Sequence, residues 1–180
     1  MILSAIVAMS RNRVIGANNK LPWHIPEDFK FYREKTKGRI LISGRKTLES
    51  LPGALPGRFQ LIISRQNGYC PPARLKLSES DYRVVGSMAE ALELAEAMLS
   101  PNHPLHRPGF GSEVFVNGGA EIYKESLAVL DRIYLTEIDM EVDGDTYFPE
   151  FDKKLFQLKE SIQKSGPPSF AFNTYERVNA

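Results

Sequence analysis

The chain has 180 residues, 42% of them hydrophobic and 10% aromatic, which suits the core of one domain and excludes wholesale disorder. Its 23 basic and 22 acidic residues leave a net charge of +1, so there is no basic surplus for nucleic acid or an anionic membrane surface. A single cysteine, Cys70, excludes an internal disulfide and favours a reducing compartment. With only three histidines beside it, we expect no structural zinc site and no bound metal.

The first residues, MILSAIVAMSRNR, are apolar but too few to span a bilayer. They lack the basic segment and the small-residue cleavage site of a secretory signal. We interpret residues 2–9 as a buried strand and expect a cytoplasmic protein with no membrane partner. The next predicted element is a helix over residues 26–36, with Phe29, Tyr32 and Thr36 along one face and Asp28 at its edge.

Beyond this helix, apolar β-branched runs alternate with helical segments. In chain order we predict strands over residues 39–43, 59–64, 82–85, 113–116 and 132–138, and helices from about Lys46, over 87–99 and over 120–130. The helix over 87–99 opens with Ser87 and Glu90 in capping-box spacing. Two stretches rich in proline and glycine, residues 65–74 and 100–112, are predicted surface loops.

The C-terminal part differs, because residues 154–162 and 169–178 alternate in polarity around the turn KSGPPS and predict a hairpin with one wetter face. Near-continuous apolarity in three of the earlier strands indicates parallel strands buried on both faces. We therefore predict a single-domain α/β fold over residues 1–180. It has a mostly parallel, twisted central sheet with an antiparallel C-terminal strand and about four flanking helices.

The stretch LPWHIPEDFKFY, residues 21–32, surrounds two acids with aromatic and apolar side chains. A local interpretation suffices for both acids: Pro26 begins a helix, and Glu27 and Asp28 face the positive end of its dipole. The alternative is that one of the carboxylates lines a ligand pocket. The residues of this stretch alone leave both interpretations open.

Three predicted strands end in residues suited to phosphate. Gly44 is followed by Arg45, Lys46 and Thr47, a second strand ends at Ser64 and Arg65, and a third runs into Gly118 and Gly119 before a helix. Glycine permits close backbone approach, and a helix start offers free N–H groups to an anion. Each signal alone is more typical of an ordinary strand-to-helix turn, but together they favour an extended ligand such as a dinucleotide.

The stretch at residues 2–36 together with ISGRKTLESL, LPGR, IISR, VNGGAEIY and IYLTEIDMEVDGDTYFP resembles the dihydrofolate reductase family in order and spacing, from Met1 to about Pro149. The resemblance, closest to the bacterial chromosomal type, implies reduction of 7,8-dihydrofolate to tetrahydrofolate with NADPH. Antifolate-type small molecules are implied ligands, and a monomer is the implied state. It also selects Asp28, and not Glu27, as the acid that binds the pterin. The catalytic positions that the resemblance implies are Leu21, Trp23, Asp28 and Tyr123.

The implied substrate residues surround the pterin, the aminobenzoyl group and the glutamate tail. They are Ile6, Val7, Ala8, Asp28, Phe29, Tyr32, Leu51, Leu55, Arg58, Asn117 and Thr136. Arg58 would pair with the α-carboxylate of the tail through a bidentate fork. Thr136 would support Asp28 through a hydroxyl hydrogen bond, although a β-branched residue in a strand needs no such role.

The implied cofactor residues include a lid, GANNK, between the first strand and the first helix. They are Ala8, Ile15, Gly16, Asn19, Lys20, Leu21, Gly44, Arg45, Lys46, Thr47, Ile63, Ser64, Arg65, Asn117, Gly118, Gly119, Ala120, Glu121, Ile122, Tyr123 and Thr146. The resemblance also implies a cis peptide bond between the two glycines at 118 and 119. The absence of an acid at the strand ends favours NADPH over NADH.

Several positions depart from the family pattern. Tyr32 replaces a frequent Phe, Asn117 stands where Ile, Val or Thr is usual, and Ser43 replaces a large apolar residue. Gly53 removes a frequent basic contact, and Glu121 brings a negative charge near the Gly-Gly turn.

Two rival functions remain at this stage. One is a reductase of the same fold that acts on a ribosylated pyrimidine in riboflavin synthesis, and the other is a non-catalytic pterin- or nucleotide-binding protein. The first gives Asp28 and the LPW segment no role. The second does not explain why every expected catalytic position holds the residue that catalysis would need.

Overall fold

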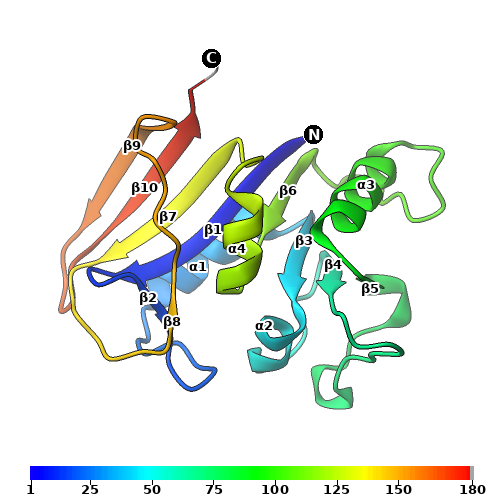
Figure 1. Cartoon of the computed structure of the whole chain (residues 1–180), viewed down its shortest axis with the longest axis horizontal. Helices are drawn as coiled ribbons and strands as arrows, with labels where there is room; N and C mark the ends of the chain where they lie inside the picture. The colour runs from blue at the N-terminus through cyan, green and yellow to red at the C-terminus, as the bar shows by residue number, and fades with distance from the viewer. Residues whose placement is uncertain (179–180) are drawn as a thin grey trace.

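Eight strands form one twisted sheet in the computed structural model, which describes residues 1–178 (Figure 1). Their order across the sheet is β5-β4-β3-β6-β1-β7-β10-β9. The strands are β1 Ile2–Ser10, β3 Arg39–Gly44, β4 Arg58–Ile63, β5 Tyr82–Val85, β6 Glu113–Val116, β7 Arg132–Ile138, β9 Phe156–Lys164 and β10 Phe170–Arg177. All pairs from β5 to β7 are parallel, and β10 is antiparallel to both of its neighbours. The predicted fold class is confirmed.

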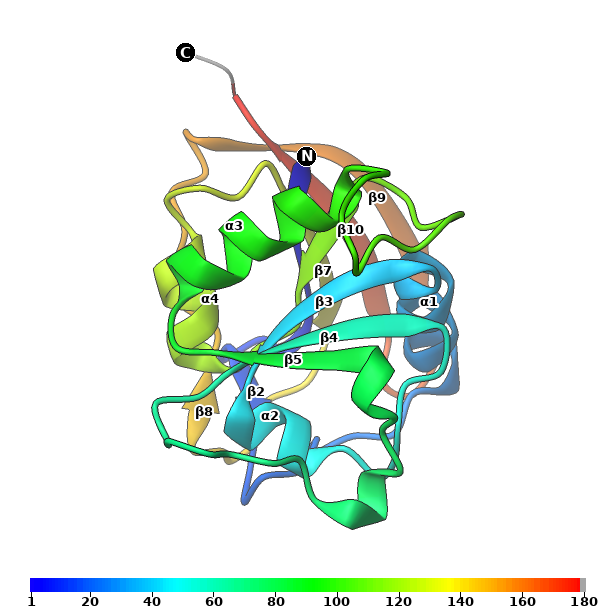
Figure 2. The ribbon, with the colours of Figure 1, turned by 90° about the vertical axis from the view of Figure 1, so that its right-hand side faces the viewer.

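The helices lie on both faces of this sheet, with α3 and α4 on one side and α1 on the other (Figure 2). They are α1 Pro26–Thr36, α2 Arg45–Ser50, α3 Met88–Leu99 and α4 Ala120–Ser126, with 3-10 turns η1 Ala73–Leu75 and η2 Glu79–Asp81. The larger core joins α3 and α4 to side chains such as Ile42, Val114 and Leu135. The opposite face packs Ile6 and Phe115 against residues of α1.

Helix α3 begins where the capping-box residues Ser87 and Glu90 predict. Its N-cap Ser87 accepts a hydrogen bond from the Glu90 N–H at 3.2 Å, and Glu90 in turn accepts from the Gly86 N–H at 2.7 Å. The expected capping box is therefore present, with the return bond one residue earlier than in the standard motif.

The structure differs from the prediction, or adds to it, at four places. Helix α4 ends at Ser126 and not near residue 130, because the Ser126 carbonyl accepts from both Val129 and Leu130 in a closing turn. The buried side chains of α1 are Asp28 and Thr36, whereas Phe29 is only partly buried. The segment over 65–74 is not simply a surface loop, since Tyr69 packs into a small core beneath α2. A short sheet of β2 Val14–Gly16 and β8 Thr146–Tyr147 was not foreseen.

Within residues 1–178, no helix is both long enough and apolar enough to cross a membrane. The predicted C-terminal hairpin is present as β9 and β10, and its outer strand β9 is exposed along most of its length.

Candidate active site

Asp28 lies in the first turn of α1, directly after Pro26 and Glu27. Its side chain faces the sheet and is only 8% exposed, and the Thr136 hydroxyl on β7 donates to Asp28 Oδ1 at 2.6 Å. Glu27 is exposed and pairs with Lys164 at 3.2 Å. The two adjacent acids, which the local stretch alone left equivalent, are therefore distinct: one is buried and bonded to the sheet, and the other is a surface group.

The surroundings of Asp28 shift its ionisation. Burial raises the pKa of Asp28 above its ordinary value of 3.8, and the hydrogen bond from Thr136 lowers it by a smaller amount. Among residues 1–178, Thr136 is the one group that bonds this carboxylate, so Oδ2 keeps its acceptor capacity for a ligand.

Apolar side chains line the sheet face around this acid. Ile6 packs with Leu55 and Tyr32, and Trp23 packs with Ala8 in a neighbouring cluster. The Trp23 Nε1 is buried and has no hydrogen-bond partner among the described residues, which leaves a donor available to a ligand or water. Sequence reasoning missed Phe31, whose ring stacks on Phe172 at 4.3 Å and closes the same face.

Strand alternation separates Val7 from its two neighbours, with which the sequence placed it. Ile6 and Ala8 face α1, whereas the Val7 side chain lies in the core on the α3–α4 side. Only the backbone atoms of Val7 can therefore make the expected contact with the substrate.

The far end of α1 holds a buried arginine. Arg58 is 7% exposed, and its guanidinium donates to Thr36 Oγ1 at 3.1 and 3.2 Å and to the carbonyls of Pro56 at 2.7 Å and Arg33 at 3.1 Å. Within the described chain no carboxylate pairs with it, and burial is the main cause that lowers the pKa of Arg58. A buried cation without an acid favours binding of an anionic ligand group.

Tyr123 lies on α4 and its side chain reaches β1. It is buried, and its hydroxyl donates to the Ile6 carbonyl at 2.7 Å. Burial strongly raises the pKa of Tyr123. The phenol is therefore held protonated and bonded to the backbone, which suits a positioning role better than proton transfer.

The three strand ends with phosphate signals are neighbours in space, because β3 lies between β4 and β6. The Gly44 N–H donates to the Gly118 carbonyl at 2.7 Å, and the Gly118–Gly119 peptide is cis as expected. A Cβ on Gly119 would lie 3.0 Å from Thr47 Oγ1, and one on Gly44 would lie 3.2 Å from Ile122 Cγ1. The glycines thus let backbone and hydroxyl groups approach closely at one edge of the sheet.

Charged groups at this edge differ in availability. Arg45 is paired with Glu49 at 3.1 Å within α2, whereas Lys46, Arg65 and Glu121 are exposed. The Ser64 hydroxyl accepts from the Gln66 N–H at 3.1 Å. Arg65 is therefore freer to meet a phosphate than Arg45, a difference that the sequence did not reveal.

The predicted lid is a tight hairpin. Ala17 and Lys20 exchange two backbone hydrogen bonds of 2.9 and 3.0 Å around Asn18 and Asn19, which both have positive φ. Two asparagines in the left-handed region are typical of a type I′ turn. The Asn18 N–H donates to Asp145 at 2.9 Å, and this bond is the main cause that lowers the pKa of Asp145. Leu21, just beyond the turn, is 47% exposed.

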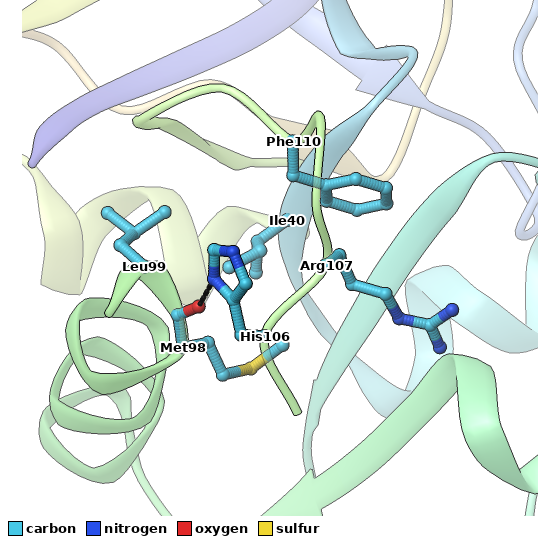
Figure 3. Close-up of a pocket in the computed structure, with 6 residues that line it drawn as sticks. All are labelled: Ile40, Met98, Leu99, His106, Arg107 and Phe110. Carbon is cyan, nitrogen blue, oxygen red and sulfur yellow. Dashed lines mark hydrogen bonds between the residues drawn. The ribbon is translucent and has the colours of Figure 1, made fainter. Parts of the chain in front are cut away.

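A small, largely apolar cavity lies elsewhere, between the end of α3 and the segment over 100–112 (Figure 3). Its polar edge is His106, whose Nδ1 lies 3.0 Å from the Met98 carbonyl. It shares no residue with the surroundings of Asp28. Within residues 1–178, no group of three His, Cys, Asp or Glu side chains could hold a metal ion.

The dihydrofolate reductase family model matches residues 2–177. The chain belongs to the dihydrofolate reductase family. It is 36% identical to the dihydrofolate reductase of Neisseria meningitidis over 97% of this chain and 98% of the relative. The Bacillus subtilis enzyme is 32% identical over 99% of this chain and 96% of its own length.

A solved structure supports the same assignment. Dihydrofolate reductase from Enterococcus faecalis, complexed with NADP(H) and RAB-propyl, superposes with a TM-score of 0.81 at 28% sequence identity. The match covers 99% of this chain and 97% of the other. The family membership expected from the sequence motifs is thus confirmed.

Asp28→Asn should alter the pH dependence of stability. The raised pKa means that ionisation of Asp28 costs the folded state free energy, a cost that is absent well below pH 3.8 and complete above the folded-state pKa. Asparagine keeps an acceptor for Thr136 but never ionises. The free energy of unfolding of the variant, relative to the unmodified protein, should therefore rise as pH increases from 4 to 7, measured by urea unfolding. The exposed acid variant Asp143→Asn should show no such rise, and a flat difference for Asp28→Asn would contradict the assignment.

Proposed function

We propose that this chain catalyses NADPH-dependent reduction of 7,8-dihydrofolate to 5,6,7,8-tetrahydrofolate. The observation that carries the proposal is the buried Asp28 bonded to Thr136 on the α1 face of the sheet, in a chain of the dihydrofolate reductase family. A carboxylate accepts two adjacent donors, as a pterin ring nitrogen and its 2-amino group present them.

The substrate would lie along α1. Asp28 would bind the pterin, the apolar side chains of Ile6, Phe29, Leu51 and Leu55 would contact the pterin and aminobenzoyl rings, and Arg58 would pair with the tail carboxylate. The absence of an acidic partner for Arg58 in the described chain supports this pairing, because the ligand would supply the missing charge.

The cofactor would lie across the ends of β4, β3 and β6. When bound, NADPH supplies the hydride that reaches pterin carbon 6. The close approach of Gly44, Thr47 and Gly119 fits its pyrophosphate, and Arg65 with Ser64 fits the phosphate on the adenosine ribose. The nicotinamide would be surrounded by Ala8, Ile15, Gly16, Leu21 and Thr146. The remaining residues of the lid and of α4 would contact other parts of the cofactor, as the resemblance implies.

Protonation of pterin nitrogen 5 needs a donor other than Asp28. The carboxylate would grip the opposite end of the ring, and the Tyr123 hydroxyl already donates to the Ile6 carbonyl. We favour a water held beneath the lid, near the unpartnered Trp23 Nε1, as the proton donor. Asp28 would orient the ring and raise its basicity, and Leu21 would help exclude bulk water.

We also propose a monomer located in the cytoplasm. The single Cys70 is exposed and unpaired, in agreement with a reducing compartment. The reductase of a ribosylated pyrimidine is not favoured, because it gives the buried Asp28–Thr136 pair no role. Spectrophotometric turnover of dihydrofolate with NADPH, against a ribosylated pyrimidine as the competing substrate, separates the two enzymes and the non-catalytic alternative.

Asp28→Asn should reduce turnover of dihydrofolate by orders of magnitude near pH 7. The neutral amide can no longer favour the protonated ring, so activity should recover partly in acid, where the substrate arrives already protonated. The measurement is the pH profile of kcat/KM for both proteins. Unchanged turnover at pH 7 would remove Asp28 from the mechanism.

Arg58→Leu should weaken binding of dihydrofolate and scarcely alter binding of a dihydropterin without the glutamate tail. Loss of a charge-assisted hydrogen bond costs about 1.5 to 3 kcal/mol, or roughly ten- to a hundredfold in affinity. Because Arg58 also bonds the last turn of α1, Arg58→Lys serves as a control that keeps the charge and loses the fork. Equal losses for both ligands would show that Arg58 acts through the fold.

The double variant Arg45→Ala with Arg65→Ala should raise the KM for NADPH strongly and the KM for NADH little. A guanidinium binds the additional ribose phosphate of NADPH by paired hydrogen bonds, and this phosphate is absent from NADH. Of the two single variants, Arg65→Ala should cause the larger rise in the KM for NADPH, because Arg45 is already paired with Glu49. Arg11→Ala, which removes an exposed ion pair with Asp139, is the matched control. Comparable efficiency of the unmodified enzyme with both cofactors would contradict this phosphate site.

A further inference from the structure

The hydroxyl of Tyr32 is buried on the α1 face that carries Asp28, and it makes no hydrogen bond within the described chain. The ring packs with Ile6, Leu41 and Phe115, so it has the apolar neighbours that a phenylalanine would have. Burial is the main cause that raises the pKa of Tyr32, and the phenol therefore stays protonated as a donor. A buried, unpaired hydroxyl destabilises the folded protein, so packing alone does not account for the oxygen.

The position of Tyr32 along the helix is informative. Asp28, Tyr32 and Thr36 are spaced four residues apart and share one face of α1, with a rise of about 6 Å at each step. Thr36 accepts hydrogen bonds from Arg58. Tyr32 is therefore midway between the acid and the arginine that would bind the two ends of the substrate.

Two further polar residues stand beside it. The charge of Arg58 first, and then the polar atoms of Asn117 and Thr36, lower the pKa of Tyr32 against the effect of burial, although none of the three completes a hydrogen bond to its hydroxyl. The Asn117 N–H donates to the Ile42 carbonyl at 2.8 Å, which extends the β3–β6 ladder by one residue. This register puts Asn117 alongside Ser43, whose buried hydroxyl is also unpartnered within the described chain. Three positions where the family usually has apolar residues are thus polar in one place.

We propose that Tyr32 and Asn117 form a specificity-determining polar contact for the middle of the substrate, the amide that joins its aminobenzoyl group to glutamate. The Tyr32 hydroxyl donates to the amide carbonyl oxygen. The Asn117 side-chain N–H donates to the Tyr32 oxygen and so directs the phenol proton to the ligand. The inference rests on the proposed function, since it presumes that Asp28 and Arg58 bind the ends of the same molecule.

Binding of two ligands tests the contact. Trp23, the only tryptophan, lies near Ala8 and reports occupancy by fluorescence. The ligands are 7,8-dihydrofolate and 6-methyl-7,8-dihydropterin, which lacks the aminobenzoyl-glutamate part. Tyr32→Phe should weaken dihydrofolate binding about two- to tenfold, the range for one net hydrogen bond, and leave the pterin unchanged. The variant removes one oxygen and keeps the ring, and Tyr82→Phe on β5 is the control that should change neither.

Asn117→Ile and the double variant complete a thermodynamic cycle. Because Asn117 acts through the Tyr32 hydroxyl, its removal should add little to the loss caused by Tyr32→Phe. Unchanged or tighter dihydrofolate binding by Tyr32→Phe, or equal losses for both ligands, would overturn the inference. If the unmodified enzyme turns over dihydrofolate and Tyr32→Phe binds it equally well, only this inference fails. If the unmodified protein does not bind dihydrofolate, the proposed function fails with it.

Discussion

The hydrogen bond from Thr136 to Asp28 is the interaction on which the proposed active site depends. It joins the first turn of α1 to β7 near the middle of the sheet and holds a carboxylate among apolar side chains. Desolvation of that carboxylate outweighs the stabilisation from Thr136, so the folded chain retains an unfavourable charge when Asp28 ionises. A ligand that donates to the remaining oxygen relieves this cost, and binding free energy is thereby concentrated at the end of the substrate that must be oriented. The site is in this sense less stable than a packed core and better suited to catalysis.

The second attachment of α1 makes the helix a rigid support for an elongated ligand. Thr36 and the Arg33 carbonyl accept from Arg58, so the C-terminal turn of the helix is tied to the start of β4. With both ends of α1 held, the spacing between the acid and the arginine is set by the helical rise and not by a flexible loop. Tyr32 occupies the interval between these attachments, where the departures from the family pattern lie.

The sequence predicts strands well because their β-branched runs report burial directly, and it predicts α3 because the Ser87 cap fixes the start of that helix. It fails where tertiary contacts decide. The end of α4 depends on a turn around Ser126, and the β2–β8 pair joins segments far apart in the chain. Composition alone likewise could not separate Asp28 from Glu27. The family resemblance selected Asp28, and the structure gives the physical distinction: β7 presents Thr136 to one acid, and Lys164 on β9 pairs with the other. The sequence-based list placed Val7 with Ile6 and Ala8 because a list of neighbouring residues ignores the alternation of a strand, which turns the Val7 side chain to the opposite face.

The cofactor edge shows why separated signals had to be considered together. The residues after β3, β4 and β6 are far apart in sequence, and none of their motifs is specific alone. They become neighbours because β3 inserts between β4 and β6, and the bond from Gly44 to Gly118 draws two of the turns together. Within α2, Glu49 lies one turn after Arg45 and pairs with it, which neutralises one of the basic residues counted from the sequence. A count of basic residues therefore overstates the positive charge available at this edge. In the proposed cofactor site, phosphate recognition would then depend more on the exposed Arg65 and on backbone groups that only glycine leaves accessible.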